Sequence, residues 1–120
     1  MKESVNVLGT QYKIELRKNT EDKLFDKLSC NGYCNEQLRL IVVGDVHSFK
    51  EYEDMAEEMM EIETKQILRH EIVHAFLRES GLCNCAVSCG ASWATNEEMV
   101  DWISLQGPKI YEAWKEVGAI

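Results

Sequence analysis

The feature that most constrains this chain is the pentapeptide His-Glu-Ile-Val-His at residues 70–74, which contains two of its three histidines. If this segment is helical, its four-residue spacing places His70 and His74 on one face, about one turn apart, where both imidazoles can bind one metal ion. Glu71 then lies roughly 100° around the helix, within reach of a water on that ion. The alternative is a solvated helix face with two histidines and an incidental glutamate. The spacing favours a metal site and a zinc-dependent hydrolytic chemistry.

A third ligand is needed, because catalytic zinc keeps three protein ligands and one water, whereas structural zinc is held by four protein ligands. His47 is the remaining histidine, but it precedes the predicted helix, and a strand-end or loop position is the other interpretation for it. The segment 95–101 offers a better candidate. Thr95 and Glu98 have the spacing of a capping box, which leaves Glu97 free to project.

Two carboxylates of the segment 95–101 therefore take different predicted roles. Glu97 is the predicted third zinc ligand, with Glu98 as the alternative. Asp101 follows Glu97 by one turn on the same helix face, where it is expected to accept the second ring N–H of a zinc-bound histidine and fix its tautomer. The simpler interpretation of both glutamates is that first-turn acids complement the helix dipole.

The hydrophobic pattern predicts one α+β domain over residues 1–120: a small antiparallel three-stranded sheet packed on a long active-site helix, with further C-terminal helices. Alternation over residues 5–17 changes phase around Gly9, which indicates a bulge or a bend into a second strand. Short strands are predicted over 29–34 and 38–43. The long helical pattern runs from Phe49 to about Ser80, and the alternative is a break near residues 63–64. The last helices are expected to open at residue 95 and to restart at Pro108.

The composition limits the partners and the compartment. A formal net charge of −8 argues against binding nucleic acid, which needs clustered basic side chains. The polar N-terminal segment and the lack of a long apolar run predict a cytoplasmic protein that does not bind a membrane. Three tryptophans are expected to pack in the core, and Trp93 is the one with an alternative place at the wall of a substrate cleft.

Five cysteines, an odd number, fit free thiols in a reducing compartment. Cys30 and Cys34 fall in the predicted hairpin, and Cys83, Cys85 and Cys89 fall in the loop between the two ligand-bearing helices. Three interpretations stay open: free thiols without a role, a second zinc or iron site, and a redox clasp such as a disulfide between Cys83 and Cys89.

The arrangement of His-Glu-x-x-His, a short loop and Asn-Glu-x-x-x-Asp resembles the gluzincin metallopeptidases. As a whole the chain is similar to the small phage-associated zincins near the ImmA/IrrE-type peptidases, most specifically over residues 69–81 and 93–103. The resemblance implies a ligand set, a catalytic acid/base and an outer carboxylate, which are respectively His70, His74 and Glu97; Glu71; and Asp101. It further implies that an edge strand pairs with an extended peptide, and in this chain that edge is expected at residues 38–44.

These observations together predict a zinc metalloendopeptidase with one Zn²⁺ per chain, which cleaves a protein or peptide substrate with Glu71 as general base. One alternative is a non-catalytic zinc-stabilised binding module of the same fold, and another is a zinc hydrolase acting on a non-peptide amide. The residue that stabilises the oxyanion is left open among four candidates, which are His47, Tyr33, Tyr111 and Arg39.

Overall fold

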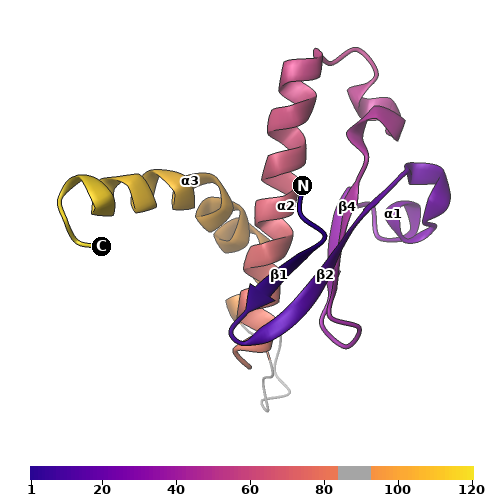
Figure 1. Ribbon diagram of the computed structural model, residues 1–120. Helices are drawn as coiled ribbons and strands as arrows, with labels where there is room; N and C mark the ends of the chain where they lie inside the picture. Colours follow the sequence, from indigo (N-terminus) through magenta and orange to yellow (C-terminus); the bar gives the residue numbers. More distant parts are fainter. Residues whose placement is uncertain (84–92) are drawn as a thin grey trace.

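The fold, in a computed structural model that describes residues 1–83 and 93–120, is α+β. A mixed sheet packs against the long helix α2, and α3 leaves the body at an angle (Figure 1). The strands are β1 (Ser4–Val7), β2 (Thr10–Arg17), β3 (Gly32–Asn35) and β4 (Leu40–Gly44). The helices are α1 (Leu24–Lys27), α2 (Glu57–Glu79) and α3 (Glu97–Glu116). Short 3-10 turns lie at Asn19–Glu21, Val46–Ser48, Lys50–Tyr52 and Trp93–Thr95.

The phase change around Gly9 is a hairpin between β1 and β2. Val7 pairs with Thr10, so the loop holds only Leu8 and Gly9. Their φ angles are 50° and 90°, the positive values that a type I′ turn requires at both central residues. The predicted bend into a second strand is therefore confirmed, and the glycine supplies the conformation that an L-residue adopts least readily.

The prediction of three antiparallel strands is wrong, because the sheet has four strands in the order β1-β2-β4-β3 and β2 runs parallel to β4. The chain leaves β2, forms α1 and β3, and returns through β4 into the place between β2 and β3. The signal for this was the run Leu-Ile-Val-Val without alternation, which is typical of an interior strand. Ile41, Val42 and Val43 are accordingly fully buried.

The edge strand beside the long helix is also misplaced by the prediction. Residues 38–44 were expected to form it, but β4 is interior, and the free edge on this side belongs to β3. The Gly44 amide donates to the Asn31 carbonyl at 2.8 Å, and this hydrogen bond fixes which residues of β3 bond to β4. In an antiparallel pair every second residue bonds to its neighbour, so the N–H and C=O groups of Gly32 and Cys34 point away from β4.

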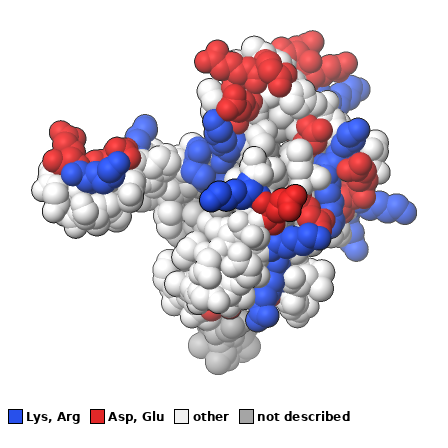
Figure 2. All heavy atoms as spheres, viewed as in Figure 1, with Lys and Arg blue, Asp and Glu red and all other residues white. Residues whose placement is uncertain are grey.

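Helix α2 is shorter than predicted and continuous. It begins at Glu57 rather than near Phe49, and it runs through residues 63–64 without a break. Its buried apolar residues are Met60, Ile67 and Ala75, whereas Met59, Ile62 and Phe76 on the same helix are exposed. Acidic side chains around its N-terminal end lie on the surface, seen at the top of Figure 2. They complement the positive end of the helix dipole.

Helix α3 runs antiparallel to α2 and then projects from the body (Figure 1). Pro108 lies inside this helix instead of starting a new one, so the predicted interruption is wrong. Proline has no N–H for the carbonyl of Ser104, four residues earlier, but the Arg69 Nε on α2 donates to that oxygen at 3.0 Å. The helix therefore continues because its partner replaces the missing donor.

The three tryptophans do not pack in the core as predicted. Trp93, Trp102 and Trp114 are each more than half exposed, and the last two lie on α3. The core is instead built between the sheet and α2, from Val7, Tyr12, Ile14, Phe25, Cys34, Ile41, Val42, Val43, Val46, Phe49, Tyr52, Met60, Ile67 and Ala75. In the described part of the chain, no helix combines the length and the apolar character that crossing a bilayer requires.

Candidate metal site

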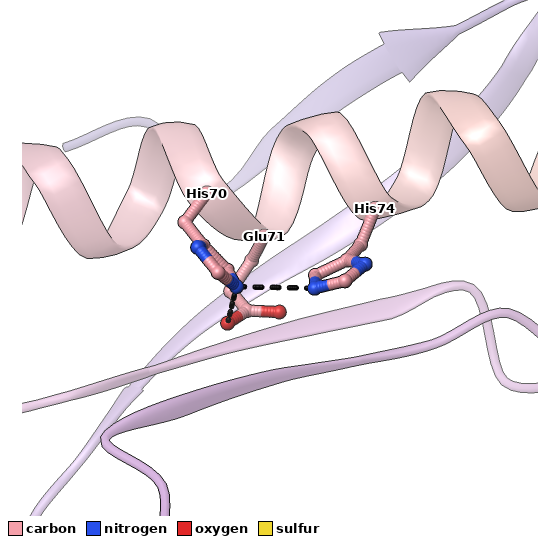
Figure 3. Close-up of side chains that lie close together, drawn as sticks. All are labelled: His70, Glu71 and His74. Carbon is pink, nitrogen blue, oxygen red and sulfur yellow. Dashed lines mark hydrogen bonds and ion pairs between the residues drawn. The ribbon is translucent and has the colours of Figure 1, made fainter. Parts of the chain in front are cut away.

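The two histidines of the pentapeptide project from one side of α2 (Figure 3). Their Nε2 atoms lie 3.0 Å apart, and the rings meet edge to face with centroids 4.7 Å apart. The side chain of His74 is 7 % exposed and that of His70 is 20 % exposed. Two ring nitrogens that face each other at this distance, both largely shielded from solvent, could bind a single cation.

Helix α3 brings Glu97 and Asp101 to the same point. Its N-cap is Asn96, whose side chain accepts from the Met99 amide at 2.8 Å, so the predicted capping box of Thr95 and Glu98 is wrong. Glu97 is nonetheless the first helical residue and Asp101 follows one turn later. The capping box was the reason for choosing Glu97 over Glu98, so that reason is wrong, although Glu97 does lie beside the two histidines.

The carboxylate of Glu97 contacts both histidines. Its Oε2 lies 3.1 Å from the Nε2 of His70 and 3.3 Å from the Nε2 of His74. With the 3.0 Å between the two rings, the three edges are nearly equal. Ligand atoms about 2.0–2.1 Å from a tetrahedral zinc are separated by about 3.3 Å, so the triangle fits one face of such a tetrahedron.

The second nitrogen of each ring is in a different environment. Nδ1 of His70 lies 2.7 Å from Oδ1 of Asp101, which leaves its Nε2 facing the Glu97 carboxylate. Nδ1 of His74 is buried and has no hydrogen-bond partner among the residues that the structure describes. Burial lowers the pKa of His74, so its imidazole favours the neutral form that binds metal.

Glu71 lies behind the histidines, with its Oε1 3.9 Å from the Nε2 of His70 (Figure 3). It is 5 % exposed, and its ligand atoms share a cluster within 4.8 Å with those of His70 and His74. Burial raises the pKa of Glu71 to about 7, against the opposing effect of His70. A carboxylate of raised pKa is a stronger base than an ordinary glutamate.

A cleft of about 830 Å³ runs from α1 past the histidines to the turn after β3. One wall is the histidine face of α2 together with Glu97, and the other is the segment 28–37, which includes β3. Gly32 stands at the closest approach of the two walls, where a Cβ would lie 2.7 Å from Ile67 Cγ2 and 3.3 Å from Glu71 Cγ. Only glycine lets the free edge of β3 come this near to Glu71.

Arg78 is a site residue that sequence reasoning missed. It follows His74 by one helical turn, lines the cleft, and donates from Nη1 to the outward-facing carbonyl of Cys34 on β3. The same nitrogen lies 3.4 Å from Glu36. The signal was available in the four-residue spacing to His74, but its partner could be known only from the position of β3.

The candidates for an oxyanion stabiliser lie elsewhere, with one exception. Tyr33 lines the cleft, but its hydroxyl donates to Asp22 at 2.5 Å, and burial raises its pKa to about 12. His47 bonds to Asp45 and Glu57. Tyr111 is on the projecting part of α3, and Arg39 is in the turn before β4 with a φ of 51°. The role stays unassigned.

Three cysteines can be placed, and all are free thiols: Cys30, Cys34 and Cys83. Burial raises the pKa of each of them, to about 11 for Cys34, so they are held as protonated thiols of low reactivity. Cys85, Cys89 and most of the predicted loop lie outside the described residues, and so does the Cys83–Cys89 clasp that was one of the three interpretations.

Comparison with protein-family models, curated proteins and solved structures finds no match for this chain. The function must therefore be inferred from the residues themselves. What the geometry brings together at one cleft is a pair of histidines, Glu97 from a second helix, a buried glutamate of raised pKa and an edge strand, and Asp101 contacts His70 beside it.

Proposed function

We propose that this protein is a zinc-dependent peptidase, with Zn²⁺ held by His70, His74 and Glu97. The observation that carries the proposal is the near-equilateral triangle of their ligand atoms, 3.0 to 3.3 Å on each edge, with Glu71 beside it. Three protein ligands leave one position for water, which is the pattern of a catalytic site. Zinc bound there supplies a Lewis acid that lowers the pKa of water from 15.7 to about 7.

Three residues of the site have further roles in the proposed reaction. Glu71 takes the proton from the attacking water and returns it to the nitrogen of the leaving amine. Asp101 holds the ring of His70 in the tautomer that presents Nε2, because it accepts from Nδ1. The outward N–H and C=O groups of Gly32 pair with the backbone of an extended peptide, as an added strand does. The substrate is therefore a protein or peptide.

A second candidate is supported by a different observation. Glu71 belongs to the same 4.8 Å cluster as the two histidines, and bound directly to the metal it would be a fourth protein ligand. Zinc closed by four protein ligands is structural, and the protein would then be a zinc-stabilised binding module without hydrolytic activity. The two candidates differ in what Glu71 does.

The Glu71→Gln variant separates them. In the peptidase, the variant binds zinc with an affinity close to that of the wild type but cleaves no peptide from a mixed set that the wild-type protein cuts. Glu97→Ala, in contrast, loses zinc affinity and cleavage together. In the binding module, Glu71→Gln loses zinc affinity to the same extent as Glu97→Ala, and the wild-type protein cuts nothing. Metal content after dialysis and peptide mass spectrometry give both readings.

A further inference from the structure

The short helix α1 is fixed at the mouth of the cleft by its buried residue and by its C-terminal turn. Phe25 is 2 % exposed and packs edge-on against Tyr33 and Phe49, with ring centroids 6.1 and 5.2 Å apart. After the helix, the Cys30 amide donates to the Phe25 carbonyl at 3.0 Å, and Ser29 has a φ of 50°. This is a Schellman turn with serine where glycine is usual, and it sets the direction in which the chain enters β3.

Anchoring Phe25 leaves two leucines of this segment on the surface. Leu24 is 36 % exposed and Leu28 is 56 % exposed. Their four-residue spacing stacks them on one side of α1, and both line the same cleft as His70, Glu71 and His74. A single exposed leucine needs no explanation, but two adjacent ones in a cleft that holds a candidate metal site indicate a binding surface.

The groups around this leucine pair indicate which kind of ligand binds there. The pair comes shortly before the start of β3, the edge strand on which the N–H and C=O groups of Gly32 point away from β4. A strand added to that edge has side chains alternating to either side, every second one toward the walls of the cleft. The opposite end of the cleft is polar, with Glu36, Gln37 and Arg78. Apolar contact is thus concentrated at the α1 end.

We propose that Leu24 and Leu28 form a subsite that selects an apolar side chain close to the scissile bond of an extended peptide. This inference rests on the proposed peptidase function, which it makes more specific by naming the substrate class. Selection follows from removal of apolar surface from water on both partners. For a subsite open to solvent on one side, a leucine is expected to exceed an asparagine at the same position by about 10-fold in kcat/KM.

The test compares synthetic peptides that are identical except for leucine, asparagine or lysine at one scanned position, cut by the zinc-loaded protein. Leu28→Glu should abolish the preference for leucine and favour lysine instead. Leu38→Glu is the matched control, because Leu38 is 70 % exposed in the turn before β4, beyond the polar end of the cleft, and does not itself line it. That control should keep the wild-type order of peptides. Equal rates for leucine and asparagine peptides in the wild type overturn the proposal, and so does a control that changes as much as Leu28→Glu.

A binding measurement separates failure of the subsite from failure of the peptidase. The zinc-loaded Glu71→Gln variant is titrated with the leucine and asparagine peptides while the NMR methyl signals of Leu24 and Leu28 are followed. If the leucine peptide alone shifts these signals but the wild type cuts nothing, the subsite stands and the peptidase proposal fails. If the wild type cuts peptides while neither one shifts the signals, the subsite fails and the peptidase stands. If no peptide is cut and none binds, both fail.

Discussion

Asp101 of α3 accepts from the ring of His70 on α2, with 2.7 Å between Oδ1 and Nδ1, although the two residues are 31 positions apart in the chain. The contact determines which nitrogen of His70 is free, since a proton on Nδ1 leaves the lone pair on Nε2. The candidate metal site therefore combines the cluster of His70, Glu71 and His74 on α2 with carboxylates that the packing of α3 brings to it.

This relationship predicts that Asp101→Ala lowers zinc affinity by about 10- to 100-fold, the usual effect of removing a carboxylate that supports a ligating histidine. Asp101→Asn keeps an acceptor oxygen and should lose less. Asp101 is half exposed, so neither change should unfold the protein. Competition with a chromophoric chelator measures the affinity. Glu98→Ala, which removes another carboxylate from the same end of α3, is the control and should bind zinc as the wild type does.

Glu71 predicts a pH dependence of stability in the metal-free protein. Burial raises its pKa from 4.5 to about 7, so the folded state holds a proton that the unfolded state has released. The stability that depends on the protonated Glu71 carboxyl is fully present below pH 4.5. As the pH rises through 7 it is lost, and the free energy of unfolding falls by about 3 kcal/mol. Glu71→Gln has no such group and should unfold at higher urea concentration than the wild type at pH 8.

The measurement is urea unfolding of both proteins in chelator at pH 5 and pH 8. Other titrating groups, including His74, are shared by the two proteins, so the difference between them isolates Glu71. The gap in the free energy of unfolding should widen as the pH rises. Parallel pH profiles for wild type and variant would falsify the assignment of a raised pKa to this carboxyl. A glutamate that destabilises the fold is expected where function requires a buried base.

Gly32 predicts a second stability effect. A Cβ there would lie 2.7 Å from Cγ2 of Ile67 and 3.1 Å from the carbonyl of Val42, so Gly32→Ala should destabilise the fold by about 1–3 kcal/mol. Since Ile67→Leu removes Cγ2, the double variant should recover part of the loss. Thermal unfolding measures both.

Gly107→Ala is the control for this prediction, and its effect on stability should be the opposite one. Gly107 lies within α3, and a Cβ there meets nothing within 4 Å. Alanine should therefore stabilise the protein by about 0.5–1 kcal/mol, because it lowers the conformational entropy of the unfolded chain and causes no clash in the folded state. A Gly32→Ala protein as stable as the wild type would show that β3 can move away from α2.

More of the candidate site than of the fold could be predicted from the sequence. His70, Glu71 and His74 share one helix, so periodicity alone places them together, and Glu97 and Asp101 are likewise one turn apart on another helix. That the two helices meet at these residues could be expected from the chemistry of zinc, which needs a third ligand. Their roles as ligands and base remain predictions.

Strand order could not be reached in the same way. Local alternation shows where a strand lies, but the position of β4 between β2 and β3 depends on a long-range parallel pairing. The unalternating run over residues 40–43 was the available sign that this strand is interior. Trp102 and Trp114 were predicted to pack in the core, yet α3 leaves the body and exposes them. The residue pattern of a helix shows which of its faces is apolar, but not which part of the protein covers that face.

Pro108 and Arg69 supply the last prediction, because the arginine replaces a donor that the proline lacks. Arg69→Ala leaves the carbonyl of Ser104 without its partner in a residue that is 1 % exposed, which should cost about 1–3 kcal/mol. Pro108→Ala restores a backbone N–H for the same carbonyl. The cost of Arg69→Ala should therefore be smaller, by about 1 kcal/mol, when residue 108 is alanine.

A double-mutant cycle by urea unfolding measures this coupling directly. Arg69 also donates to Gln66 at 2.7 Å, but that loss is present in both backgrounds and cancels in the cycle. Arg69→Lys, which keeps one flexible donor, should fall between the wild type and Arg69→Ala. Equal costs for Arg69→Ala in the two backgrounds would show that the helix continues past Pro108 without help from α2. Since α3 also carries Glu97 and Asp101, zinc affinity should fall with Arg69→Ala and recover in part with the added Pro108→Ala.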